Sequence, residues 1–224
     1  MRLEDFFKNN GKLFTTVFSF SLADKKKYQL DLSVDNLELN QINLFSVKEL
    51  GGYIERKVNE KSADLAIGGY GEDRMIYRKS KHFGSGENAR TIHLGIDVWL
   101  AAGTSIHAPY DAKVHSLRNN DNYGDYGPTV ILEHEMGGLQ FYTLYGHLSK
   151  SSLNGLNPGK TIEKAQLFAT LGNDDENGNW PPHLHFQIIK NMGDYSGDFP
   201  GVASEKEKEK MLNVCPDPML ILNI

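Results

Sequence analysis

The sequence predicts a mainly β protein, an antiparallel β-sheet platform preceded by a small α+β N-terminal region. From about residue 72 onward, short apolar runs are separated by Gly, Pro, Asn and Asp, which is typical of closely spaced strands joined by tight turns. Residues 1–71 instead carry one clear helix start beside strand candidates. We therefore expect an accessory region of strands plus one helix over residues 1–71, and a β-rich domain with a C-terminal tail over residues 72–224.

In the N-terminal region, residues 13–22 form the most apolar stretch and are predicted to be a strand. The stretch is far shorter than the roughly 20 apolar residues of a membrane span. Residues 28–34 alternate between apolar and polar side chains, which is the period of a strand with one buried face. Ser46 and Glu49 have the spacing of a capping box, which predicts a helix running towards Glu60.

The β-rich domain offers further strand candidates at residues 91–99, 112–117, 129–135, 139–147, 161–163, 167–171 and 183–189. Gly137-Gly138, between two of them, predicts a hairpin turn. Residues 204–210 consist of Ser, Glu and Lys and are expected to form a solvated helical face. The Cys-Pro-Asp-Pro run at residues 215–218 then interrupts regular structure before a final apolar strand or tail.

The composition is that of an ordinary soluble globular protein, with 39% hydrophobic and 24% charged residues among 224. A net charge of −5 and the lack of a long cationic run argue against nucleic acid as a partner. The single cysteine excludes an internal disulfide. Because no secretory signal and no membrane span is recognised, the chain as written is expected in the cytoplasm, with export by another route left open.

The residues that carry chemistry are grouped in three short motifs: His93-x-x-x-Asp97, Tyr145-Gly146-His147-Leu148 and His183-Leu184-His185. Each motif lies in a segment with strand-like alternation, and successive strand side chains point to opposite faces. His93 and Asp97 are therefore expected on one face, and His183 and His185 likewise share a face. Gly95 is expected to leave open space between His93 and Asp97 for a metal and its water.

These residue types suit a zinc-hydrolase site. Catalytic zinc commonly takes three protein ligands from His, Asp or Glu and keeps a fourth position for water, whose pKa falls from 15.7 towards roughly 7. The motifs offer four histidines and one aspartate, so two histidines remain for proton transfer and oxyanion stabilisation. Alternation does not decide which of His183 and His185 binds the metal, because both face the same way. His93 and Asp97 alone would more often be a hydrogen-bonded pair, but the three motifs together favour a metal site.

In this order and spacing, the motifs make residues 88–190 similar to the M23 family of metallopeptidases, the LytM and lysostaphin-like zinc endopeptidases. Four other stretches add to the similarity: Gly103–Pro109, Asp125–Gly127, Asn157–Lys160 and Leu171-Gly172. The resemblance implies the family's fold, a small antiparallel β-sheet platform with the metal in an open groove across it.

The resemblance also implies the roles of the motif residues. His93, Asp97 and His185 correspond to the family's Zn²⁺ ligands, and His147 and His183 correspond to its two catalytic histidines that do not bind the metal. The implied activity is that of a zinc-dependent endopeptidase, which hydrolyses peptide bonds through a metal-activated water, in peptidoglycan-type or glycine-rich peptides. The expected partner is then a peptide, cell-wall peptides included. One alternative is a non-catalytic peptide-binding or regulatory module that keeps the fold, and another is a zinc amidase acting on a small amide.

The chain departs from the family pattern before the last motif, where residues 173–182 form a longer acidic loop. The acidic residues at 174–176 would favour substrates with a free amine. Trp180 in this loop is a candidate for substrate binding, with capping of the sheet as the alternative. Tyr145 is the second such candidate, as a donor to an oxyanion, with a packing role as the alternative. Ordinary roles are expected for the remaining histidines, His82, His107, His115 and His134.

Overall fold

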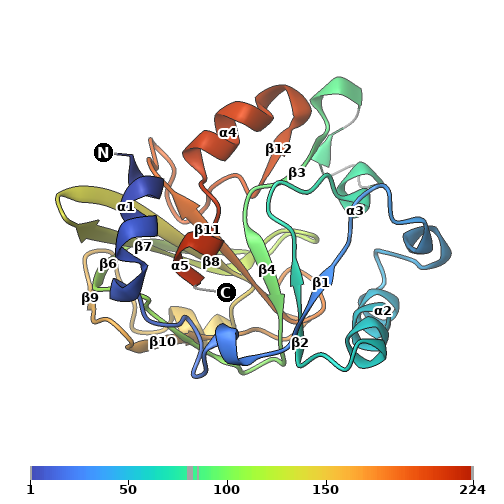
Figure 1. The fold of residues 1–224 in the computed structure, drawn as a ribbon, viewed down its shortest axis with the longest axis horizontal. Helices are drawn as coiled ribbons and strands as arrows, with labels where there is room; N and C mark the ends of the chain where they lie inside the picture. The colour runs from blue at the N-terminus through green and yellow to red at the C-terminus, as the bar shows by residue number, and fades with distance from the viewer. Residues whose placement is uncertain (1, 80–82, 85, 223–224) are drawn as a thin grey trace.

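The computed structural model describes residues 2–79, 83–84 and 86–222. Its main element, over these residues, is an eight-stranded sheet in the order β1-β2-β4-β11-β8-β7-β6-β9 (Figure 1). The strands are β1 (Lys27–Leu30), β2 (Leu65–Gly68), β4 (Ile96–Trp99), β6 (Ala112–Asn120), β7 (Gly127–Met136), β8 (Leu139–Gly146), β9 (Thr161–Ile162) and β11 (His183–Ile189). All neighbours pair antiparallel except β1 and β2, so the predicted mainly β fold with an antiparallel platform is confirmed.

Residues 91–99 form two strands in different sheets and not the one continuous strand that was predicted. β3 (Arg90–His93) pairs with β12 (Val202–Ser204), whereas β4 pairs with β2 and β11 in the large sheet. The chain changes sheets at Leu94 and Gly95, where the Leu94 amide donates to the carbonyl of Gly201 (2.9 Å). A second small sheet pairs β5 (Ser105–His107) with β10 (Leu167–Thr170).

The helices are short, with α2 (Val47–Glu60) the longest among the described residues; the others are α1 (Leu3–Asn10), α3 (Met75–Lys79), α4 (Lys208–Val214) and α5 (Met219–Leu222). α2 begins as predicted, since the Ser46 hydroxyl accepts from the Glu49 amide (3.3 Å). The capping box is half formed, because the Glu49 carboxylate accepts from the Asn43 amide (2.8 Å) and not from that of Ser46. No helix of the described residues is both long and apolar enough to cross a membrane.

The strand predicted at residues 13–22 is wrong, and the final segment, predicted as a strand or tail, is helical. Residues 13–22 consist of bends beside 3-10 turns at Gly11–Leu13 and Leu22–Asp24, and only isolated hydrogen bonds tie them down, such as that from the Thr15 amide to the Pro109 carbonyl (2.8 Å). The final apolar segment forms α5, because Asp217 accepts from the Met219 amide (2.9 Å) and so caps a helix start. The solvated helical segment after Ser204 is present as a 3-10 turn followed by α4.

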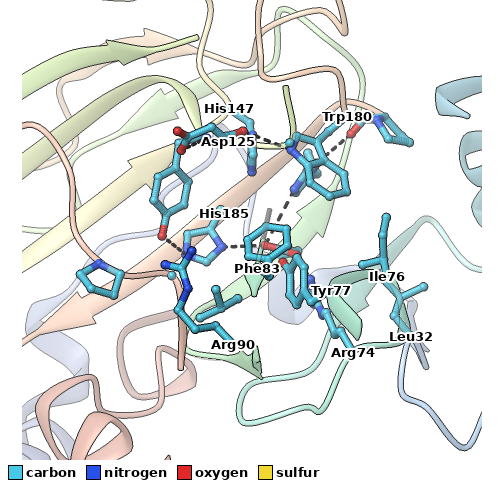
Figure 2. Close-up of a pocket in the computed structure, with 18 of the residues that line it drawn as sticks. Leu32, Arg74, Ile76, Tyr77, Phe83, Arg90, Asp125, His147, Trp180 and His185 are labelled. Carbon is cyan, nitrogen blue, oxygen red and sulfur yellow. Dashed lines mark hydrogen bonds and ion pairs between the residues drawn. The ribbon is translucent and has the colours of Figure 1, made fainter. Parts of the chain in front are cut away.

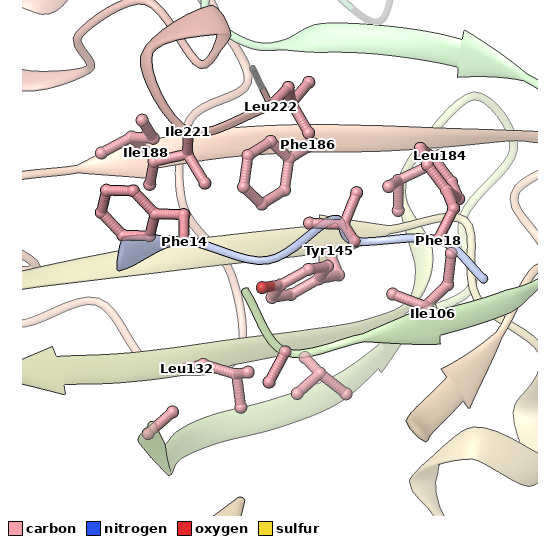
Figure 3. Close-up of a cluster of buried hydrophobic side chains, with 14 of the residues drawn as sticks. Phe14, Phe18, Ile106, Leu132, Tyr145, Leu184, Phe186, Ile188, Ile221 and Leu222 are labelled. Carbon is pink, nitrogen blue, oxygen red and sulfur yellow. The ribbon is translucent and has the colours of Figure 1, made fainter. Parts of the chain in front are cut away.

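The largest hydrophobic core lies on one face of the sheet, under α1, residues 14–20 and α5 (Figures 1 and 3). Alternate side chains of β11 supply its centre, namely Leu184, Phe186 and Ile188, each fully buried. The intervening side chains of β11 therefore point to the opposite face, which carries the site described below. A second core joins the N-terminal region to Trp99 of β4 and Val202 of β12.

His134, on β7, couples stability to pH. Its ring is buried between the Asp111 carbonyl (3.0 Å from Nδ1) and the Thr143 hydroxyl (2.7 Å from Nε2), and burial lowers its pKa to about 4. In the unfolded chain the same histidine takes up a proton near pH 6.5. The neutral buried ring therefore stabilises the fold fully above pH 6.5, and this stabilisation is lost as the pH falls towards 4. Between pH 7.5 and 5, we expect the unfolding free energy of the wild type to fall by about 2 kcal/mol more than that of His134→Gln.

Urea unfolding at the two pH values measures this difference, with His115→Gln on the neighbouring strand β6 as the control. His115 is only half-buried. A His134→Gln protein with the same pH dependence as the wild type would contradict the expectation.

Candidate metal and catalytic site

Three potential metal ligands converge where β3, β4 and β11 meet. The Asp97 carboxylate oxygen Oδ1 lies 3.0 Å from His185 Nδ1 and 3.4 Å from His93 Nε2, and the two ring nitrogens are 3.0 Å apart. Asp97 and His185 are direct partners in the β4–β11 register, so the sheet itself brings them together. All three side chains are buried. Among the residues that the structure describes, this is the one group of three such side chains close enough to share an ion.

The hydrogen bonds of the two rings define which nitrogens carry protons. His93 Nδ1 lies 2.9 Å from the Gly69 carbonyl, which can only accept, so Nδ1 is the donor and Nε2 is bare. His185 Nε2 lies 3.0 Å from Gln187 Oε1. The Gln187 amide nitrogen donates to the Pro200 carbonyl (3.1 Å), which fixes the orientation of the amide. In a neutral His185 ring, Nε2 is therefore the donor and Nδ1 is bare.

Two bare ring nitrogens and a carboxylate oxygen thus face one another with no proton between them. Such an arrangement is repulsive in a buried site unless a cation lies among the three atoms. A proton on His93 does not supply that charge at neutral pH, because burial lowers the pKa of His93 to about 4. Burial alone would raise the pKa of Asp97, but His93 and Arg74 outweigh it and hold that pKa well below its usual range. The donor set and its outer hydrogen bonds fit a zinc ion.

Arg74 orients the Asp97 carboxylate from the outside. The Arg74 guanidinium is 3% exposed, contacts the second carboxylate oxygen of Asp97 and pairs with Glu72 (2.9 Å). Its backbone is held by a bond from its amide to the Thr91 carbonyl (3.0 Å). This role could not be predicted from the sequence, because Arg74 stands in a charged segment that looks like an ordinary solvent-exposed turn. Oδ1 of Asp97 is thereby left to face the histidines.

His147 and His183 lie beside the three ligand candidates, with ring centroids 4.2 Å apart. His147 Nδ1 donates to the Asn177 carbonyl (2.8 Å) and His183 Nδ1 donates to the Pro181 carbonyl (2.7 Å). Each ring therefore presents a bare Nε2. Burial lowers the pKa of both rings, so both are neutral and able to accept a proton at neutral pH.

The acidic loop at residues 173–182 positions these two rings. Asn177 is fully buried, and its side chain donates to the Trp180 carbonyl (3.0 Å) and accepts from the Trp180 amide (2.9 Å). Glu176 accepts from the backbone amides of Lys150 (2.7 Å) and Asn173 (3.3 Å). Glu176 thus braces the loop itself, and residues 174–176 do not line the cavity described next. Neither the positioning of His147 by Asn177 nor the bracing of the loop by Glu176 was predicted from the sequence.

A cavity of about 380 Å³ opens beside these groups (Figure 2). Asp97, His147, His183 and His185 line one side of it, whereas His93 lies behind them. Trp180 lines the cavity, as one of its two predicted roles required, and its indole N–H donates to the Asp125 carbonyl (3.1 Å).

Tyr126 also lines the cavity, and its hydroxyl lies 3.5 Å from His185 Nε2. In the sequence, this tyrosine stands out only as part of the Asp125–Gly127 stretch that resembles the family, and no role was predicted for it. That resemblance was the one signal that could have singled it out.

Tyr145 lies on the opposite side of the sheet, so the predicted contact with substrate is wrong and the packing alternative describes it. The ring is fully buried against Phe168 and Phe186, and its hydroxyl is 3.0 Å from that of Thr143 (Figure 3). β8 ends at Gly146 and His147 has a φ of +60°, which turns its ring to the other face. The alternation expected from Tyr145 to His147 therefore does not hold.

Gly95 does not leave open space for a metal, contrary to the prediction. A Cβ at this position would lie 2.6 Å from His185 Cε1 and Nε2, so the ring of His185 occupies that space. The remaining histidines behave as expected where they are described: His107, His115 and His134 do not line the cavity. His82 lies outside the described residues.

Residues 91–196, which include all five motif residues proposed for the site, match the model of peptidase family M23. This segment is just under half of the chain, and the family is the one that its motifs predicted. No curated protein matches the chain.

Several solved structures are similar to it. The catalytic domain of the antimicrobial peptidase lysostaphin from Staphylococcus simulans is 23% identical over 60% of this chain and 81% of that one, with a TM-score of 0.43. A zinc-containing peptidase from Vibrio cholerae is 26% identical over 50% and 30% of the two chains, with a TM-score of 0.37. A putative M23 peptidase from Pseudomonas aeruginosa is 22% identical over 58% and 43%, with a TM-score of 0.38. The match thus spans less than half of the last two proteins.

Proposed function

We propose that this protein is a zinc-dependent endopeptidase. One observation carries the proposal: three buried, proton-free donor atoms converge beside two neutral histidines that line the same cavity. The match of residues 91–196 to peptidase family M23 supports hydrolysis of a peptide bond as the reaction. A module that only binds peptides has no need for two spare histidines next to a ligand set, which weighs against the regulatory alternative.

His93, Asp97 and His185 would hold the zinc, which supplies Lewis-acid chemistry by acidifying a water and polarising a peptide carbonyl. His147 or His183 accepts a proton from the attacking water at its bare Nε2 while the water oxygen bonds to the carbonyl carbon. The imidazolium formed in this step faces the developing oxyanion. It then returns the proton to the leaving nitrogen as the carbon–nitrogen bond breaks. Arg74 keeps the Asp97 carboxylate fixed throughout.

The substrates proposed from the family resemblance are peptidoglycan-type and glycine-rich peptides. Product analysis by mass spectrometry separates this proposal from the amidase alternative, because an endopeptidase releases two peptide fragments.

Metal removal tests the proposal directly. We expect one zinc per chain in the isolated protein, loss of that zinc in Asp97→Ala, and loss of cleavage when a chelator is added to a panel of glycine- and D-alanine-containing peptides. Cleavage should return when zinc is restored, because the site residues themselves remain intact. Zinc bound at one per chain without cleavage of any peptide would contradict an endopeptidase and favour the binding module. A protein that binds no zinc would contradict the metal site.

A further inference from the structure

We propose that the cavity beside the metal site binds a bulky apolar side chain of the substrate, of the size of leucine or phenylalanine, next to the bond that is cleaved. The inference rests on the proposed function and narrows its substrate class. The proposed substrate thus differs both from a peptide made only of glycine and from a peptide recognised through a free amine.

The cavity has a catalytic side and an apolar side. Nine apolar side chains that line it belong to the second core, and each is at most 9% exposed. Four of them come from the N-terminal region, namely Leu32, Leu39, Leu44 and Leu50, and the others include Ile76 and Trp99. Figure 2 shows Leu32 and Ile76 at the side away from His147 and His185. A substrate held at the histidines thus has an enclosed apolar space within reach.

Trp99 joins the two sides of the cavity. Its ring stacks on that of His183 with centroids 5.5 Å apart, and it belongs to the same hydrophobic cluster as the aliphatic residues. Gly68 makes this placement possible, because a Cβ there would lie 2.6 Å from the Trp99 ring and 2.8 Å from Arg74 Nη2. The apolar space therefore begins directly at a proposed catalytic histidine.

Loop contacts enclose the apolar side. The Tyr123 hydroxyl donates to the Phe45 carbonyl (2.7 Å), which links the loop before β7 to the N-terminal region. On α2, a Cβ at Gly51 would lie 3.7 Å from Pro181, so the helix packs close to the loop that carries His183. A side chain in this space is removed from water, which favours apolar groups.

The aliphatic part of the cavity disfavours a charged side chain. Five charged residues line the cavity as a whole: Arg74 and Asp97, which pair with each other, and Arg90, Asp125 and Asp198. Figure 2 shows Asp125 and Arg90 on the side of His147 and His185, away from Leu32 and Ile76. A lysine or diamino acid placed among the aliphatic side chains would bury an amine without a partner, which is costly. A glycine would leave the space unfilled and gain nothing from it. The three acidic residues at 174–176 do not line the cavity and so offer no site for the amine.

Tryptophan fluorescence can test occupancy without any cleavage. The protein has two tryptophans, Trp99 and Trp180, and both line the cavity. Blocked pentapeptides Gly-Gly-X-Gly-Gly, with X as Gly, Ala, Lys, Leu or Phe, are titrated against zinc-loaded His147→Ala. We expect Kd to fall about 10- to 100-fold from X = Gly to X = Leu or Phe, from the burial of one large apolar side chain. Equal Kd values for all X, or tightest binding with Lys, would overturn the inference.

Two variants of the cavity wall extend the test. Ile76→Phe should fill the apolar side and remove the gain in affinity of the Leu and Phe peptides over the Gly peptide. Leu44→Ala should enlarge it and favour Phe over Leu. Leu37→Ala is the matched control, because Leu37 is 74% exposed in the same region and does not line the cavity. Unchanged preferences in both wall variants, with folding verified by thermal unfolding, would also overturn the inference.

The outcome separates this inference from the proposed function. Binding with the apolar preference but no cleavage by the wild type would support the cavity assignment and contradict the endopeptidase. Cleavage by the wild type with equal kcat/KM for all X would support the endopeptidase and overturn the cavity assignment.

Discussion

His147→Ala is expected to lower the rate of peptide cleavage by about 10²- to 10⁴-fold while one zinc per chain remains bound, which is the usual contribution of a positioned general base. The metal should stay because the three ligand candidates do not include His147. Cleavage should fall because the ring offers a bare Nε2 to the cavity, fixed by the bond from Nδ1 to the Asn177 carbonyl (2.8 Å).

Zinc content and kcat/KM for one susceptible peptide measure the two halves of this expectation. His115→Ala serves as the control, since His115 is half-buried on β6, packs on Tyr142 and does not line the cavity. Full activity in His147→Ala would remove this histidine from the mechanism and leave His183 as the base. Loss of zinc in the same variant would show that His147 supports the metal ligands and does not serve only in proton transfer.

The sequence predicted the arrangement of the site residues only where they lie on a regular strand. β11 is paired on both sides, with β4 and β8, so its period of two holds and His183 and His185 share the face opposite Phe186. The prediction failed where the chain leaves this regularity. His147 has a φ of +60°, and Gly95 lies at a change of sheets, and neither is visible as a break in the apolar pattern.

The contributions of the N-terminal region and of the turn that follows it could not be predicted in the same way. Gly69 binds His93 through its carbonyl and Arg74 holds Asp97, but both residues occupy a turn without an apolar period or a motif. β2 joins the large sheet beside β4, and this tertiary pairing brings the turn to the metal site. The apolar wall of the cavity likewise comes from side chains that, in the sequence, look like the ordinary core of a small region.

Gly95→Ala is expected to weaken zinc binding by at least about 10- to 100-fold, comparable to the loss of an outer-shell partner of a metal ligand. The added methyl group would lie 2.6 Å from His185 Cε1 and Nε2 and 2.8 Å from the Phe186 carbonyl. The ring cannot yield freely, because Nε2 donates to Gln187 (3.0 Å) and the ring packs on Tyr126. Any movement of the ring therefore displaces Nδ1 from its place 3.0 Å from Asp97.

Competition with a chromophoric chelator measures the zinc affinity, and thermal unfolding of the zinc-free proteins measures the cost of crowding. Gly52→Ala is the matched control, because a Cβ at this exposed position on α2 would contact nothing within 4 Å. That variant should keep the wild-type zinc affinity and gain up to about 1 kcal/mol of stability from the better helix propensity of alanine. If Gly95→Ala bound zinc as tightly as the wild type, the His185 ring would not be confined as its contacts require, and the convergence of the three donors would need another cause.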